Sequence, residues 1–250
     1  MPKKGFEQSK FEQSKKDLKQ SLETNEARIK EAESKIEYEI NIFKVPKGEV
    51  YFFDGNDKKT GKGDCNEQLK IPEGTKKIIA NGNVNMKGAK GFKYLSVYAA
   101  GNVTGQELDL GEYLAVRATG NVDLINKSGT IISVTNNGDV KLGGFTYASV
   151  NSRGSVLSTK RSMSFQEITT QGDISIFNLA KDNKVNAGGN VRITENYGTV
   201  NAGGNVTVIK NDSGNINQNL LTSHTKSLPS FSGREDNRSA SRNISDGLGM

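Results

Sequence analysis

Two distant stretches of the chain share one pattern: Val116-Arg117-Ala118-Thr119-Gly120-Asn121-Val122-Asp123-Leu124 and Val200-Asn201-Ala202-Gly203-Gly204-Asn205-Val206-Thr207-Val208. Each places a glycine before a polar residue and then a valine. A glycine followed by Asn, Asp or Ser and then Val or Ile recurs at spacings of 15 to 19 residues: Gly82, Gly101, Gly120, Gly138, Gly154, Gly172, Gly189 and Gly204. Self-similarity with a short period over one region is typical of a solenoid.

Aligning the chain on these glycines shows two columns of β-branched apolar residues. Two residues after the glycine stand Val84, Val103, Val122, Val140, Val156, Ile174, Val191 and Val206. Four residues before it stand Ile78, Val97, Val116, Val134, Val150, Ile168, Val185 and Val200. Val and Ile make up only 33 of the 250 residues, so sixteen matches out of sixteen indicate a structural repeat. Alternation of such residues with polar ones indicates β-strands.

These columns predict a mainly β protein: a single-stranded parallel β-helix, or β-solenoid, of about eight coils over residues 76–217. Small or short side chains occupy the position two before the glycine, among them Ala99, Ala118 and Ala202. We expect the glycine to supply a backbone shape that other residues adopt reluctantly. The Asn-rich column after the glycine predicts side-chain amides that hydrogen-bond up the stack as a ladder.

The first 37 residues predict a helical segment, because they are rich in Glu, Lys and Gln and have no Pro or Gly after Gly5. A thin apolar seam has the heptad spacing of a coiled coil. Its positions are Leu18, Leu22, Ile29 and Ile36, with Asn25 and Ala32 between them. The helix could dock on the end of the solenoid, which we favour, or self-associate with a second copy.

Residues 38–75 predict a cap of strand, turn and strand followed by a loop. Apolar side chains alternate with polar ones over much of residues 40–45 and form a cluster at residues 50–53. The turn Pro46-Lys47-Gly48 lies between the two stretches. The last segment, residues 218–250, is rich in Ser, Asn and Arg, and we expect it to be disordered.

A further column lies seven residues before the glycine and is largely aromatic. Its aromatic members are Tyr94, Tyr113, Tyr147, Phe165 and Tyr197. It predicts either an internal or corner stack that covers the core, or an exposed stripe that would bind sugar rings or the apolar surface of a partner.

The composition offers little for catalysis. Cys65 is the only cysteine and His224 the only histidine, and the latter lies in the tail. The glycine-rich loop of residues 54–64 has the spacing of neither a phosphate-binding loop nor a calcium loop. We therefore expect no catalytic residues, no cofactor and no metal.

Charge and hydropathy restrict the partners and the location. The net charge of +6 is not gathered into a Lys/Arg run, so we expect no nucleic-acid partner. The sequence has no apolar run of transmembrane length, and polar residues follow the N-terminus where a Sec signal needs an apolar run. We expect a cytoplasmic protein, or one exported by a route that needs no signal peptide.

The repeat units quoted at the outset resemble those of filamentous-haemagglutinin-type bacterial adhesins. This resemblance covers about residues 76–217 and implies a right-handed parallel β-helix. The chain is less similar to bactofilins, cytoskeletal β-helix polymers, which would imply end-to-end stacking that the N-terminal segment would block at one end.

We expect a non-catalytic bacterial scaffold that presents a rigid solenoid surface, adhesin-like or effector-like, to a protein or glycan partner. One alternative is a self-assembling, bactofilin-like scaffold. Another is a carbohydrate-binding or carbohydrate-active protein, for which Asp109, Glu112 and Asp123 form the nearest carboxylate group in the sequence.

Overall fold

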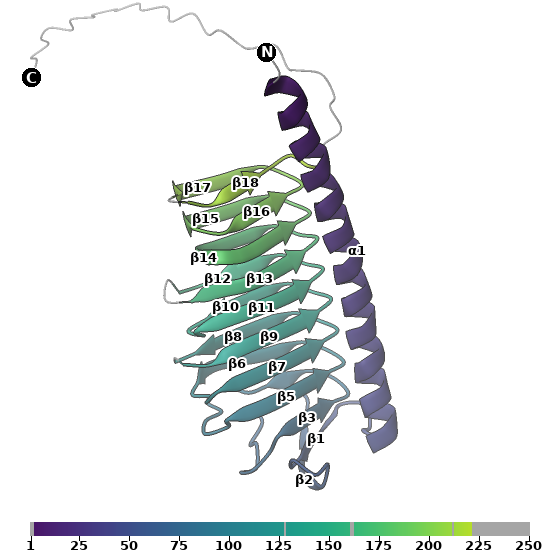
Figure 1. Cartoon of the computed structure of the whole chain (residues 1–250). Helices are drawn as coiled ribbons and strands as arrows, with labels where there is room; N and C mark the ends of the chain where they lie inside the picture. Colours follow the sequence, from purple (N-terminus) through teal and green to yellow (C-terminus); the bar gives the residue numbers. More distant parts are fainter. Residues whose placement is uncertain (1–2, 128, 161–162, 212, 222–250) are drawn as a thin grey trace, which may run out of the picture.

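The protein is a β-solenoid with one long helix along its side, as a computed structural model shows for residues 3–127, 129–160, 163–211 and 213–221 (Figure 1). Helix α1 spans Lys3–Phe43. The strands are β1 (Glu49–Phe53), β2 (Lys59–Asp64), β3 (Lys77–Ala80), β4 (Val84–Asn85), β5 (Tyr94–Ala99), β6 (Val103–Leu108), β7 (Tyr113–Ala118), β8 (Val122–Asn126), β9 (Ile131–Asn136), β10 (Val140–Gly143), β11 (Tyr147–Ser152), β12 (Val156–Ser158), β13 (Ser164–Thr170), β14 (Ile174–Ala187), β15 (Val191–Asn196), β16 (Thr199–Ala202), β17 (Val206–Asn211) and β18 (Asn215–Asn217).

From β3 onward every strand pairs in parallel with the strand one coil away, which confirms the predicted fold of about eight coils. The strands form two stacks. The helix-side stack, which α1 contacts, consists of β3, β5, β7, β9, β11, β13, the second half of β14, β16 and β18. The far stack consists of β4, β6, β8, β10, β12, the first half of β14, β15 and β17.

The two Val/Ile columns form the core between these stacks. In the far stack Val84 pairs with Val103 and Val103 with Val122, and in the helix-side stack Val97 pairs with Val116. Fifteen of the sixteen side chains are buried, and Val206, in the last coil, is partly buried. Full burial of such a side chain contributes about 1.5–3 kcal/mol, so these columns are a major source of stability.

The polar column after the glycine is a ladder up the stack, in which main-chain N–H groups are the main donors. One side-chain pair also bonds, from Asn190 Nδ2 to Asp173 Oδ1 at 3.3 Å. The side-chain oxygen of each residue accepts the main-chain N–H of its counterpart in the next coil. The Oδ1 of Asn102 accepts from Asn121 N at 2.8 Å, and that of Asn121 from Asp139 N at 2.8 Å. These hydrogen bonds therefore join successive coils at the turn after the repeat glycine, where no strand pairing joins them.

The repeat glycines are required for a different reason from the one we predicted. None of them is among the glycines with positive φ, so an unusual backbone shape does not explain them. A Cβ added at Gly101 would instead lie 2.6 Å from the Oδ1 of Asn83 and 2.8 Å from the main chain of Gly82. At Gly82 the buried thiol of Cys65 takes the place of that amide, 2.8 Å from the position of a Cβ.

We predict that Gly101→Ala destabilises the protein by about 1–3 kcal/mol, because the methyl group would force neighbouring coils apart. Gly55→Ala is the matched control, since the nearest atom to its Cβ would be a side-chain carbon of Lys76 at 3.8 Å. Denaturant unfolding measures both changes. Equal stability of the two variants would contradict the steric explanation.

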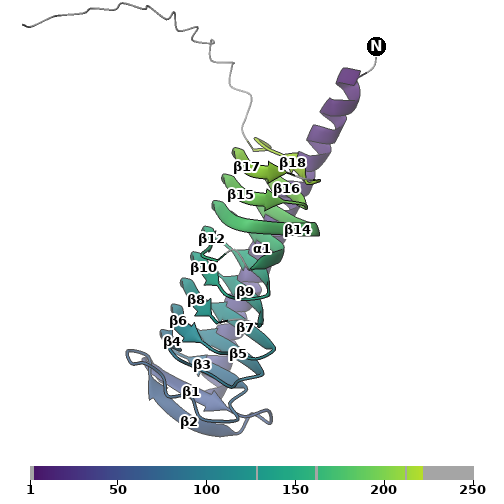
Figure 2. The same cartoon turned by 90° about the vertical axis from the view of Figure 1, so that its left-hand side faces the viewer.

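The N-terminal end of the solenoid is closed by antiparallel strands. β1 pairs with β3, and β2 pairs with β1 to form the outer edge (Figure 2). The predicted strand at residues 40–45 is wrong, because α1 continues to Phe43. The helix ends where Lys44 adopts a φ of 51° and Val45 N donates to Ile40 O at 3.0 Å, a common helix C-terminal motif, with Pro46 preventing continuation.

Helix α1 lies along the side of the solenoid, not on its end as we predicted, and crosses β3 to β16 (Figure 1). Its predicted seam faces the coils: Leu18, Asn25, Ile29, Ala32 and Ile36 are buried, and Leu22 is partly buried. A helix rises about 5.2 Å in 3.5 residues, whereas coils are about 4.8 Å apart. A slightly inclined helix with heptad spacing therefore places about one seam residue over each coil.

We predict that Ile29→Ala lowers the free energy of unfolding by about 2–5 kcal/mol, because it empties a fully buried position. Ile42→Ala in the same helix is the control. Ile42 is 51% exposed, and its loss should change stability by less than about 0.5 kcal/mol. Hydrogen exchange of the α1 amides should rise in the first variant only.

At the C-terminal end, residues 218–221 belong to the solenoid although we assigned them to the tail. Leu220 is fully buried, and its N–H donates to Ala202 O at 3.0 Å. The rest of the predicted disordered tail, residues 222–250, lies outside the described residues.

Candidate functional site

Part of the aromatic column is an exposed ladder on the helix-side stack. Tyr94, Tyr113, Ile131 and Tyr147 are the first residues of β5, β7, β9 and β11, and they pair in register from coil to coil. Their exposed fractions are 52%, 38%, 40% and 41%. We call these four residues the exposed ladder.

Phe165 and Tyr197 do not extend the exposed ladder. Tyr147 pairs with Ser164, and a bulge at Gln166 separates the pairs Ala148–Phe165 and Ser149–Glu167. Phe165 therefore points inward and is fully buried, so at this residue the column follows the internal alternative and not the exposed stripe. Tyr197 is half-buried just before β16, with Lys210 Nζ 6.0 Å from its ring centroid.

The surroundings of the exposed ladder favour contact with another molecule. The next outward column on the same strands contains only small side chains, namely Ser96, Ala115, Ser133 and Ser149. The side chains of the exposed ladder therefore project from the sheet beside a strip of small side chains. Charged groups lie at one end of the exposed ladder, where the Tyr94 hydroxyl donates to Glu112 and Lys93 Nζ lies 3.8 Å from Glu112. At the other end Glu167 pairs with Ser149. The carboxylate of Glu112 raises the pKa of Tyr94.

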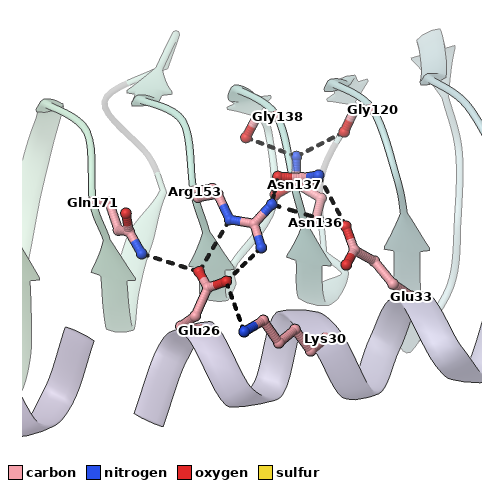
Figure 3. Close-up of polar contacts among 9 residues, drawn as sticks. All are labelled: Glu26, Lys30, Glu33, Gly120, Asn136, Asn137, Gly138, Arg153 and Gln171. Carbon is pink, nitrogen blue, oxygen red and sulfur yellow. Dashed lines mark hydrogen bonds and ion pairs between the residues drawn. The ribbon is translucent and has the colours of Figure 1, made fainter. Parts of the chain in front are cut away.

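The densest polar constellation lies where α1 meets the turns of the middle coils (Figure 3). Arg153 donates to both carboxylate oxygens of Glu26, at 3.0 Å from Nε and 2.6 Å from Nη2. Gln171 donates to Glu26 from the next coil at 3.1 Å, and Asn137 donates to Glu33 from the preceding coil at 2.9 Å. We call Glu26, Glu33, Asn137, Arg153 and Gln171 the polar clasp.

Further contacts fix the helix outside the polar clasp. Arg28 donates to Asn151 at 3.1 Å. The buried Asn25 donates to Ser152 O at 2.8 Å. Near the end of α1, Lys77 Nζ lies 3.3 Å from Glu39 and 2.5 Å from Asp57. Burial lowers the pKa of Lys77, but its hydrogen bond to Asp57 and the charge of Glu39 outweigh burial, so the net shift is upward.

Glu26 and Arg153 of the polar clasp favour each other's charged form, which suits a structural role. The hydrogen bond from Arg153 lowers the pKa of Glu26, and Glu26 raises the pKa of Arg153. A carboxylate held as an anion against a guanidinium is a poor general acid or base at neutral pH. The sequence does not reveal the polar clasp, because its residues are ordinary charged and amide side chains. One signal was present: long polar side chains immediately precede three successive repeat glycines, at Asn137, Arg153 and Gln171.

The three carboxylates considered for carbohydrate chemistry are not brought to one place. Asp123 faces outward on β8 in the far stack and pairs with Lys141 at 3.0 Å. Glu112 lies just before β7 of the helix-side stack, with Tyr94 and Lys93. Asp109 forms an isolated parallel β-bridge with Lys90 through the main chain, in the loop between the stacks. The three carboxylates therefore lie in three different segments of the coils, each with different neighbours.

The remaining reactive residues are placed as follows. Burial, with the charge of Asp64, raises the pKa of the Cys65 thiol to about 11, which leaves it protonated at neutral pH. His224 lies outside the described residues. Among the described residues no three His, Cys, Asp or Glu side chains gather in a way that could hold a metal ion. No helix in the described part of the chain has the length and apolar character needed to cross a bilayer.

Comparison with known proteins identifies no relative. The chain matches no protein-family model, no curated protein and no solved structure. The function must therefore be argued from the surfaces described here.

We predict that acid weakens the docking of α1 through Glu26. Because the folded-state pKa of Glu26 lies below its ordinary value of 4.5, its contribution is complete above that value and disappears as the pH falls through the folded-state pKa. The stability difference between the native chain and Glu26→Gln should therefore be largest near neutral pH and shrink in acid. Denaturant unfolding across this pH range measures it.

Glu31→Gln is the control for this prediction, since Glu31 is an exposed residue of the same helix. It should match the native chain at every pH. A stability difference for Glu26→Gln that does not change with pH would show that the Glu26 charge is unimportant.

Proposed function

We propose that the protein is a non-catalytic scaffold that binds a protein partner through the exposed ladder. The observation that supports this most is the register of Tyr94, Tyr113, Ile131 and Tyr147, which a parallel solenoid holds at a fixed spacing. Large apolar side chains on a rigid support lose little conformational entropy when they bind, which favours affinity.

The composition of the exposed ladder supports a protein partner. Tyrosine is enriched where protein interfaces carry most of their binding energy, because it adds apolar area and a hydroxyl group with few rotatable bonds. The neighbouring strip of small side chains gives a partner access to the sides of the ladder. The resemblance to adhesin repeats agrees with a binding role, but it supports the fold more than the partner.

Substitution of the ladder tests the proposal. A variant with Tyr94→Ser, Tyr113→Ser and Tyr147→Ser should remain folded, because all three side chains are substantially exposed. Immobilised native protein should retain a partner from an extract of the cells that make it, and the ladder variant should retain at least tenfold less of that partner. Quantitative mass spectrometry of the bound fraction measures this.

Leu157→Ser is the matched control, because Leu157 is 42% exposed on β12 in the far stack. It should bind the partner like the native chain. Equal capture by the ladder variant and the native chain would overturn the proposal. Loss of binding to a glycan array, with unchanged protein capture, would assign the same surface to a sugar ligand.

A further inference from the structure

The two ends of the solenoid are chemically different. At the N-terminal end the outer strand is β2, Lys59-Thr60-Gly61-Lys62-Gly63-Asp64, whose side chains are mostly exposed. It carries two lysines and two glycines, and Lys59 Nζ lies 3.0 Å from the ring centroid of Tyr51. Charged residues on an edge strand oppose pairing with another chain. This end is therefore protected against further stacking.

At the C-terminal end the described residues leave part of the core columns uncovered, although Leu220 is buried there. Val206 and Val208 continue columns that are buried in the preceding coils, yet both are only partly buried. Ile216 stands one coil beyond the fully buried Val200 and is 38% exposed. Ile209 and Leu221, beside them, are 64% and 44% exposed. We call these five residues the open end.

The polar groups around the open end are suited to pairing with a copy of themselves. A true amide ladder runs up the helix-side stack, where Asn201 donates to Asn186 at 2.9 Å and Asn217 donates to Asn201 at 2.8 Å. An amide both donates and accepts, so an amide ladder can continue with an identical residue. Of the described residues between 204 and 221 only Lys210 is charged, so like-charge repulsion would be small.

Helix α1 continues past this end of the solenoid (Figures 1 and 2). With Asn25 over β11 and about 3.5 residues per coil, roughly the first eight residues of the helix extend beyond β18. Among the described residues this extension of the helix has no solenoid surface to pack on. Another solenoid placed against the open end would supply such a surface.

We propose that the open end binds the open end of a second copy of this chain. The contact is isologous, because the opposite end carries the protected strand β2 and offers no matching surface. An isologous contact closes after two copies. The result is a dimer and not a filament, which separates this proposal from the end-to-end polymer that the bactofilin resemblance would imply.

The molar mass of the full chain in solution tests the proposal. Light scattering during gel filtration should give twice the chain mass of 27.1 kDa, falling to one chain mass on dilution. Ile209→Lys should weaken the dimer at least tenfold while leaving the unfolding transition intact, because Ile209 is mostly exposed. Leu157→Lys, on the far stack, is the control and should remain dimeric.

A crosslinking variant provides an independent measurement. Equivalent residues near the two-fold axis lie close to each other, so Ile209→Cys should form a disulfide-linked dimer under mild oxidation. The native chain should not, because its only thiol, Cys65, is buried. Leu157→Cys should not crosslink either. A monomer at every concentration, or a dimer that persists unchanged in Ile209→Lys, would overturn the proposal. Neither outcome would alter binding at the exposed ladder, which is on the side of the solenoid.

Discussion

Close, constant spacing between neighbouring coils is the constraint on which this structure depends. The Val and Ile columns bury each other only if each coil lies directly over the last, and the hydrogen bonds from side-chain oxygens to main-chain N–H groups fix that distance at the turns. The turn glycines are a consequence of this spacing, because the space of a Cβ is already filled by the coil beneath. Surface side chains repeat at the same spacing, as the exposed ladder shows most clearly.

The helix illustrates how one spacing can serve two architectures. A heptad seam usually indicates a helix that packs on another helix, since 3.5 residues bring the seam back to the same side. Here the same interval is close to the distance between coils, so the seam packs on a stack of strands. Beneath it the outward column of the stack is mixed and largely polar, with Thr135, Asn151 and Thr169 in its middle. The seam and the polar clasp therefore act together. The seam buries Ile29 and Ile36, and the polar clasp determines where the helix lies along the stack.

The sequence predicted the solenoid well because all eight coils place the same residue types in the same environment. Prediction from the sequence failed where a single local feature, such as a bulge or a helix end, determines the structure. The bulge at Gln166 turned Phe165 inward, and no periodic pattern could show that. Residues 40–45 suit a strand by alternation, but Ile40 and Phe43 pack against Val45, Phe53 and Ile79 from the last turn of the helix. Steric exclusion at the glycines, and the bond from Arg153 to Glu26, depend on distances between coils that a sequence does not contain.

The position of α1 has a consequence for the order in which the chain can fold. The helix is synthesised before the solenoid, yet Asn25 bonds to Ser152, 127 residues later, and Glu26 to Gln171, 145 residues later. Contacts so distant along the chain are slow to form. During synthesis the amphipathic helix can dock fully only after most coils have formed, and its N-terminal half docks last. A helix that is synthesised before the solenoid is thus among the last segments to reach its native place, and a solenoid that is a few coils short would leave part of it without a surface.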